Sequence, residues 1–168
     1  MRWGSLMTYL LDANIFIEAK NRYYGLDFCP AFWQWLIQQN QNGIVFSVEK
    51  VGDELKAGND DLATWASQRG PTFFLPPDAA MIPAMSTLSK WVNTQNYHQS
   101  AVTTFLQDAD YYLVAYALAH GHTVVTHEQH DNGLKRVKIP TPCIALNVRC
   151  VTPFEMLRYE HAQFVLGP

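Results

Sequence analysis

The sequence has few of the features that mark secreted or membrane proteins. Its three cysteines are odd in number and show no C-x-x-C spacing, so neither a disulfide scaffold nor a zinc knuckle is encoded. The most apolar N-terminal stretch, residues 6–17, is interrupted by Asp12 and Asn14. It is therefore too short and too polar for a signal-peptide core or a membrane span. We expect a cytoplasmic protein that does not associate with membranes.

Charge is also scarce, since only 16% of the residues are charged. Twelve Lys and Arg against 15 Asp and Glu give a net charge of −3, which argues against an extended basic surface but not against a local basic patch. The 48% of apolar residues excludes an intrinsically disordered chain. A length of 168 residues fits one domain. We expect that domain over residues 7–168, with residues 1–6 as a disordered lead-in.

Short apolar runs alternate with longer helical patterns, which is typical of an α/β fold. The strands show little polar alternation, so we expect a mostly parallel central sheet flanked by helices in three layers. The expected strands are residues 8–11, 44–47, 73–75, 123–126 and 143–146. The expected helices are residues 15–22, 31–39, 48–56, 60–68, 78–93 with a break at Pro83, 103–119 and 153–164, the last with a capping box that starts at Thr152.

Two acidic residues follow directly after predicted strands. Asp12 ends the run 8–11, and Glu128 comes just after the run 123–126. Ligands collect at the carboxyl ends of strands in an open α/β sheet, so both residues are candidate site residues. The alternatives stay open, because Asp12 or Asn14 could simply cap the next helix, and Glu128 could be an ordinary loop residue.

Two further acids lie on predicted helices. Asp110 shares the apolar face of its helix, where an unpaired carboxylate would be costly to bury unless an arginine were its partner. Asp108 lies about 200° away around the same helix and is expected to face solvent or cap the helix. Glu54 lies at the edge of an apolar stripe, and taken alone it reads as a solvated helix charge. Four carboxylates at one edge of a sheet would repel one another and would favour a hard cation such as Mg²⁺ or Mn²⁺.

Four segments together resemble the PIN-domain nucleases. Residues 9–17 (YLLDANIFI) are similar to the family's first strand with its acidic turn. Residues 51–55 (VGDEL), 110–117 (DYYLVAYA) and 121–128 (GHTVVTHE) resemble the elements that carry the other three acids. The order and spacing of these segments cover roughly residues 7–147.

The resemblance implies a metal-dependent ribonuclease that hydrolyses phosphodiester bonds in RNA. It also implies that Mg²⁺ or Mn²⁺ is held by four acids with two polar supports. The acids are Asp12, Glu54, Asp110 and Glu128, and the supports are Asn14 and Thr126. Among bacterial members, the VapC-like toxins pair with a small antitoxin protein that covers the active-site groove. An antitoxin partner and a homodimer are therefore family expectations for this chain.

The sequence departs from the PIN pattern in two places. The fourth acid is Glu128 where the family often has Asp, and Asp131 is the nearby substitute. The aromatic-rich insertion over residues 23–35 resembles an uncharacterised PIN subgroup more than the best-known toxins. Lys135, Arg136 and Lys138 follow the acidic loop and are candidates to contact an RNA backbone, although a solvated charged turn is an equal alternative.

Other site chemistries fit the sequence less well. The two histidines of His127-Glu128-Gln129-His130 are three positions apart, whereas two zinc-binding histidines on one helix face are four apart. Asn14 stands where a haloacid-dehalogenase phosphatase would place its second, proton-donating Asp. No Lys follows the last predicted strand, as a phospho-receiver domain would require.

The alternative to an enzyme is a non-catalytic PIN-like binding module. Such a module would hold a partner helix in an aromatic surface groove. The candidate groove residues are Phe28, Phe32, Trp33, Trp35 and Leu36. Because most aromatic stripes at helical spacing are buried, the same residues are also predicted as core.

Overall fold

The computed structural model describes residues 6–167. Within them, five strands form one parallel sheet in the order β3-β2-β1-β4-β5. The strands are β1 (Tyr9–Leu11), β2 (Val45–Val48), β3 (Phe74–Leu75), β4 (Thr123–Val125) and β5 (Cys150–Val151). The predicted α/β fold with a mostly parallel sheet is confirmed. The expectation of a disordered lead-in lies outside the described residues, except for Leu6, which is exposed.

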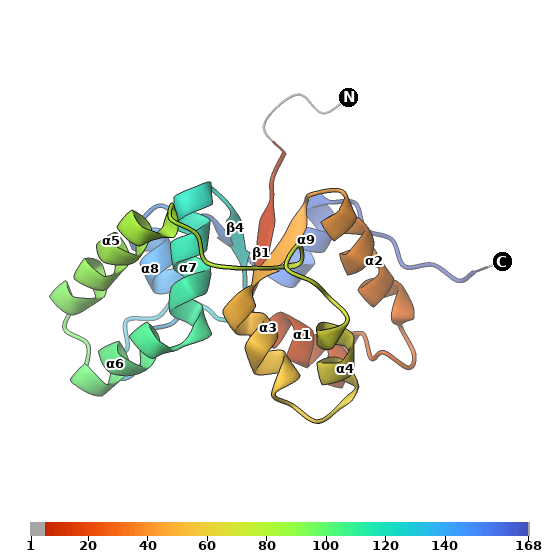
Figure 1. Ribbon diagram of the computed structural model, residues 1–168, viewed down its shortest axis with the longest axis horizontal. Helices are drawn as coiled ribbons and strands as arrows, with labels where there is room; N and C mark the ends of the chain where they lie inside the picture. The colour runs from red at the N-terminus through yellow and green to blue at the C-terminus, as the bar shows by residue number, and fades with distance from the viewer. Residues whose placement is uncertain (1–5, 168) are drawn as a thin grey trace.

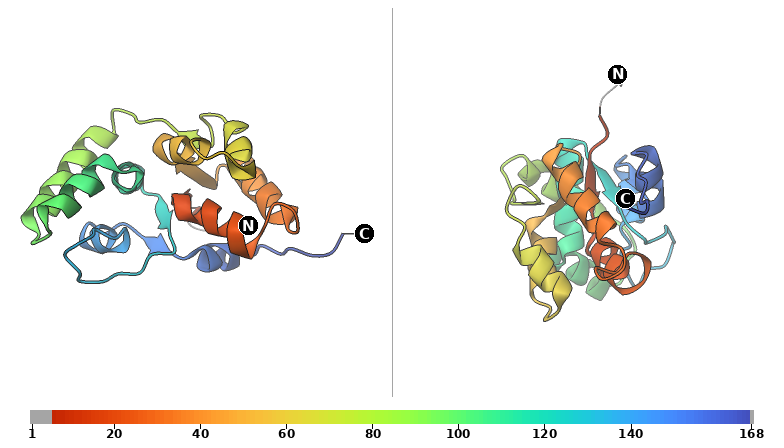
Figure 2. Two further views of the ribbon diagram at one scale, coloured as in Figure 1. Left: turned by 90° about the horizontal axis from the view of Figure 1, so that it is seen from below. Right: turned by 90° about the vertical axis from the view of Figure 1, so that its right-hand side faces the viewer.

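Helices cover both sides of this sheet. They are α1 (Ala13–Glu18), the π-helix η1 (Ala19–Tyr23), α2 (Pro30–Gln41), α3 (Glu49–Lys56), α4 (Asp61–Ser67), α5 (Met81–Thr94), α6 (Gln99–Gln107), α7 (Ala109–His120), α8 (Pro140–Ala145) and α9 (Pro153–Tyr159). In the left view of Figure 2, α8 and α9 lie on one side of the strands, and α3 and α7 lie on the other. The α5–α6 pair extends away from the sheet at one end of the molecule (Figure 1).

The core forms around the central strand β1, whose three residues are fully buried. Helix α7 packs against β2, β4 and α5, and its buried residues lie on almost all of its faces. A helix that is apolar all round is a buried helix. The hydroxyl of Tyr111 donates a hydrogen bond to the carbonyl of Met85 (2.7 Å) and ties α7 to α5. The first turn of α7 is therefore held firmly at the carboxyl edge of the sheet.

The predicted fifth strand was wrong. Residues 143–146 belong to α8 and to its C-terminal end, and the strand forms later, where Cys150 and Val151 pair with Val124 and Val125. Pro140 begins α8, a position where the missing N–H costs nothing. Periodicity alone cannot distinguish a short apolar run in a strand from one in a helix, which is why the prediction failed.

The predicted helix over residues 103–119 is two helices. Asp108 has an extended backbone (φ −91°, ψ 160°) between α6 and α7, and its Oδ1 accepts a hydrogen bond from the N–H of Ala109 (2.7 Å). The capping alternative for Asp108 is therefore confirmed. Pro83 does not break α5, because it is the third residue of that helix, where the N–H has no partner within the helix.

The last helix is shorter than predicted but begins as predicted. Thr152 and Glu155 form the capping box, and α9 ends at Tyr159 rather than near residue 164. His161 follows with φ of 54°, a left-handed conformation that is incompatible with a continuing helix.

The proposed aromatic groove on α2 is not a surface feature. Phe32, Trp33, Trp35 and Leu36 are buried, and of the five candidates only Phe28 is exposed. The indole N–H of Trp33 donates to the carbonyl of Tyr24 (2.7 Å), which fixes the ring inside the core. Across residues 6–167, no helix has the length and apolarity needed to span a membrane.

Candidate active site

Asp12 lies at the carboxyl end of the central strand. Its backbone N–H donates to the carbonyl of Val125 (3.0 Å), so the residue continues the pairing of β1 with β4. Its backbone occupies the N-cap position of α1, but its side chain accepts no capping hydrogen bond. The Oδ2 atom instead accepts a hydrogen bond from the hydroxyl of Thr126 (2.9 Å). Asp12 is therefore the N-cap residue of α1, as the capping alternative expected, but its carboxyl group is held by Thr126.

The Asp12 carboxyl group is almost completely shielded from water. The residue is only 3% exposed. Burial raises its pKa to about 6, the hydrogen bond from Thr126 lowers it, and the nearby charges of Glu128 and Glu54 raise it again. The carboxylate is thus in an environment where a positive charge would be strongly favoured.

Asp110 lies in the first turn of α7 and is half-buried. Burial raises its pKa to about 8, and the charges of Asp12, Asp108 and Glu128 act in the same direction, while Arg136 opposes them. The charge of Asp12 raises the pKa of Asp110, and the charges of Glu54 and Glu128 raise the pKa of Asp12. The structure therefore brings the four predicted acids into one electrostatic neighbourhood.

Glu128 is held by groups on three sides. Its side chain is 11% exposed and forms an ion pair with the guanidinium of Arg136. Its Oε2 accepts a hydrogen bond from the N–H of Ile139 (2.7 Å). Its own N–H donates to the hydroxyl oxygen of Thr126 (3.1 Å). Thr126 thus joins Asp12 to Glu128.

Glu54 and Asn14 are the more peripheral members of the predicted set. Glu54 is an exposed residue of α3, yet partial desolvation of its carboxyl group raises the pKa, and the charge of Asp108 adds to the effect. Asn14 is exposed on the first turn of α1. Of the two predicted polar supports, Thr126 is the one whose hydrogen bond holds Asp12.

The carboxylates do not form a finished metal site. In the part of the chain that the structure describes, no three His, Cys, Asp or Glu side chains are arranged to hold a metal ion. The chemistry of the donor set nevertheless fits a divalent cation, because carboxylate oxygens are the hard ligands that Mg²⁺ and Mn²⁺ prefer. Desolvated carboxylates that raise one another's pKa also lack the positive charge that such an ion supplies.

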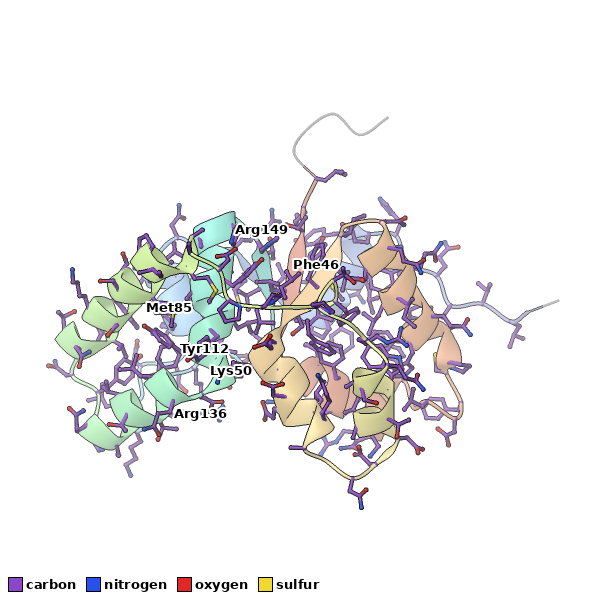
Figure 3. The ribbon with its side chains drawn as sticks, in the orientation of Figure 1. Phe46, Lys50, Met85, Tyr112, Arg136 and Arg149 are labelled. Carbon is purple, nitrogen blue, oxygen red and sulfur yellow. The ribbon has the colours of Figure 1, made fainter. Side chains whose placement is uncertain are left out.

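The loop that follows Glu128 brings positive charge to this region. Lys135 and Arg136 line a pocket of about 250 Å³ together with Asp108 and Asp110. Figure 3 labels Arg136 below Tyr112 and Lys50, at the lower end of α7. Lys138 instead forms an ion pair with Asp131.

Comparison with known protein families identifies the family to which this chain belongs. The family described as "Domain of unknown function (DUF4411)" matches residues 9–164. The chain is a member of the DUF4411 family. The matched range includes all four predicted acids and the loop that carries Arg136.

The fold of this chain is also found among solved structures. A chain in a structure of FitAB bound to an IR36 DNA fragment is 19% identical, with a TM-score of 0.53. The match covers 88% of the present chain and 96% of that chain. At this level of identity the likeness shows the fold alone. No curated protein matches the sequence.

Asp131 of this DUF4411 chain is positioned differently from Glu128. Its Oδ1 accepts a hydrogen bond from the N–H of Gly133 (2.9 Å), and its pKa is lowered by the hydrogen bond from Lys138. Asp131 is not among the charges that act on Asp12 or Asp110, whereas Glu128 acts on both. The hydrogen bonds that link Glu128 to Asp12 through Thr126 therefore favour Glu128 over Asp131 as the fourth acid.

Two further residues near the candidate site, Asp108 and Lys50, were not predicted from the sequence to be site residues. Asp108 was expected only as a cap or a surface charge, but it also raises the pKa of Asp110 and Glu54. Lys50 reaches from α3 to the ring of Tyr112 on α7, with its Nζ 5.1 Å from the ring centre (Figure 3). Its spacing of four residues from Glu54 puts both on one face of α3, a signal that the sequence did contain.

Proposed function

We propose that this DUF4411 protein is a metal-dependent endoribonuclease of the PIN type. The observation that carries the proposal is the electrostatic coupling of Asp12, Asp110, Glu54 and Glu128 at the carboxyl edge of the central strands. A binding module has no need to desolvate several like charges, since each costs free energy unless a cation compensates it. A hydrolase that binds a cation does need such a group of carboxylates.

In this proposal the four carboxylates hold Mg²⁺ or Mn²⁺. When bound, such an ion supplies a water of lowered pKa and offsets negative charge on the phosphate group. Thr126 keeps the Asp12 carboxylate in place, and the N–H of Ile139 does the same for Glu128. Asp110, whose pKa burial raises to about 8, would have to be deprotonated to serve as a ligand of such an ion.

The RNA backbone is proposed to enter from the side of the 135–138 loop. Lys135 and Arg136 line the pocket next to Asp110, where a phosphate group would meet positive charge. Such contacts position a nucleic acid without reading its sequence. Lys138, which was also predicted to contact RNA, is paired with Asp131, and Arg136 is paired with Glu128, so a phosphate group would compete with a carboxylate for each of these two side chains.

The proposal extends to a partner. The order of the acidic motifs is similar to that of the VapC-like toxins, and on that basis we propose a small antitoxin protein that covers the acidic site, and a homodimeric toxin. Size measurement of the purified protein, together with identification of any small protein that copurifies with it, tests both assemblies. A monomer that copurifies with nothing would contradict both.

The nuclease proposal is tested with an RNA pool that contains single-stranded and structured segments. Wild type, Asp12→Asn and the matched control Asp53→Asn are incubated with Mg²⁺, Mn²⁺ or EDTA. Asp53 is exposed on α3, next to Glu54 in the chain. We expect cleavage by wild type and by the control in either metal, and none with EDTA or by Asp12→Asn. Absence of cleavage by folded, partner-free wild type would contradict the nuclease proposal.

A further inference from the structure

Three aromatic side chains from distant parts of the chain meet beside the acidic site. Tyr23, the last residue of η1, stacks on the ring of His127 with centroids 5.6 Å apart and planes at 24°. The edge of Phe154, from α9, meets Tyr23 at 5.3 Å and 84°. Phe154 also contacts His127 at 6.0 Å. We call these three residues the aromatic cluster.

The aromatic cluster is linked to the candidate active site through the backbone of His127. His127 lies between Thr126, which holds Asp12, and Glu128, so its Cα atom is about 3.8 Å from the Cα of each. The aromatic cluster is thus attached to the chain segment that carries Thr126 and Glu128.

Tyr23 is not buried as a core aromatic residue would be. It is 44% exposed, whereas the next residue, Tyr24, stacks on the buried Phe32 with centroids 4.5 Å apart. The N–H of Tyr24 donates to the carbonyl of Ala19 (2.7 Å), five residues back, which is the wide turn of a π-helix. Such turns occur frequently at functional sites, and here the turn leads the chain to Tyr23 at the molecular surface.

The charges around the aromatic cluster are compatible with a nucleic acid. The carboxylate of Glu18, which acts on His127, is paired with Arg22 (3.2 Å), so it does not stand as a lone negative charge. Arg158 lines an adjoining pocket of about 200 Å³ together with Phe154 and Tyr24. Arg158 therefore supplies positive charge on one side of the cluster.

We propose that Tyr23 and His127 form a stacking subsite for an unpaired base of RNA, next to the phosphate on which the carboxylates act. The inference rests on the proposed function. Proteins recognise single-stranded RNA by stacking its splayed bases on aromatic side chains, and this contact tolerates any base. The subsite gives the enzyme a preference for unpaired RNA and no preference for sequence.

The test measures binding without cleavage. In the Asp12→Asn background, a fluorescein-labelled single-stranded RNA hexamer is titrated by anisotropy, with the same RNA as a duplex for comparison. Tyr23→Leu keeps an apolar side chain but removes the aromatic face, and Tyr23→Trp keeps the face. We expect Tyr23→Leu to weaken single-strand binding about five-fold or more, Tyr23→Trp to bind within about two-fold of the parent, and duplex binding to change little.

The outcomes separate this inference from the nuclease proposal. Equal single-strand affinity for Tyr23→Leu and the parent, or no RNA binding, would overturn the subsite. Equal loss of affinity in Tyr23→Leu and Tyr23→Trp would assign Tyr23 a structural role, and this result would also overturn it. Tyr23-dependent RNA binding together with no metal-dependent cleavage by wild type would keep the subsite and refute the nuclease.

Discussion

The hydroxyl of Thr126 donates a hydrogen bond to Oδ2 of Asp12 across 2.9 Å, and this bond joins the carboxyl ends of β1 and β4. Asp12 and Thr126 are 114 positions apart in the chain. The same hydroxyl oxygen accepts from the N–H of Glu128 (3.1 Å). One buried side chain thus positions two of the four acids.

Replacing Thr126 by Val should damage the site while keeping its shape. The variant leaves Asp12 and the N–H of Glu128 without their partner, and it removes a bond that lowers the pKa of Asp12. We expect metal-dependent cleavage to fall about 10- to 100-fold and the free energy of unfolding to fall by about 1–3 kcal/mol. Thr126→Ser keeps the hydroxyl and should retain most of the activity. Equal rates for the Val and Ser variants would refute this role of the hydroxyl.

Asp110 should make the metal-free protein less stable as the pH rises. Its pKa is about 8 in the folded protein and has the ordinary, lower value in the unfolded chain. Between about pH 4 and pH 8 the folded state therefore holds a proton that the unfolded state has lost, so stability decreases with increasing pH. Asp110→Asn removes this dependence and should be more stable than wild type by about 1–3 kcal/mol at pH 8, with little difference at pH 4.

Urea unfolding in EDTA at pH 4, 6 and 8 measures the effect of Asp110→Asn. Asp12 contributes in the same direction around its pKa of about 6, so the variant should keep part of the pH dependence. Identical stability differences between variant and wild type at all three pH values would show that Asp110 titrates normally.

The fourth acid can be identified by a matched pair of variants. Glu128 acts on Asp12 and Asp110 and is only 11% exposed, whereas Asp131 is paired with Lys138 in the surface loop. We expect Glu128→Gln to lower the cleavage rate about 100-fold or more, and Asp131→Asn to leave it within about three-fold of wild type. Cleavage rates under saturating Mn²⁺ decide the matter, and the reverse order of effects would assign the role to Asp131.

Much of the fold was readable from the sequence because the sheet strands are short runs without polar interruption. The strand before Asp12 and the strand before Thr126 were both predicted within one residue. Their parallel pairing then places Asp12 and Glu128 at one edge of the sheet, as expected. The Asp110 helix also lies where the pattern of apolar residues put it, although it begins at Ala109 rather than at residue 103.

The remaining features depend on contacts that no local pattern encodes. Cys150 and Val151 form a strand because β4 offers them an open edge, whereas the more apolar run 143–146 packs as part of a helix. The ion pair of Arg136 with Glu128 joins residues of a loop without regular structure, so periodicity gives no information about it. The place of Tyr23 depends on a π-turn that sequence spacing does not reveal.

The central claim is that these carboxylates form one divalent-cation site, and calorimetric titration with Mn²⁺ at pH 7 tests it most directly. Titrations in two buffers of different ionisation enthalpy count the protons released. For wild type and Asp53→Asn we predict saturable binding with release of protons, because burial raises the pKa of Asp110 to about 8. Asp12→Asn and Asp110→Asn should lose most of the binding. Wild type that binds no Mn²⁺, or Asp12→Asn that binds it as tightly as wild type, would contradict the account.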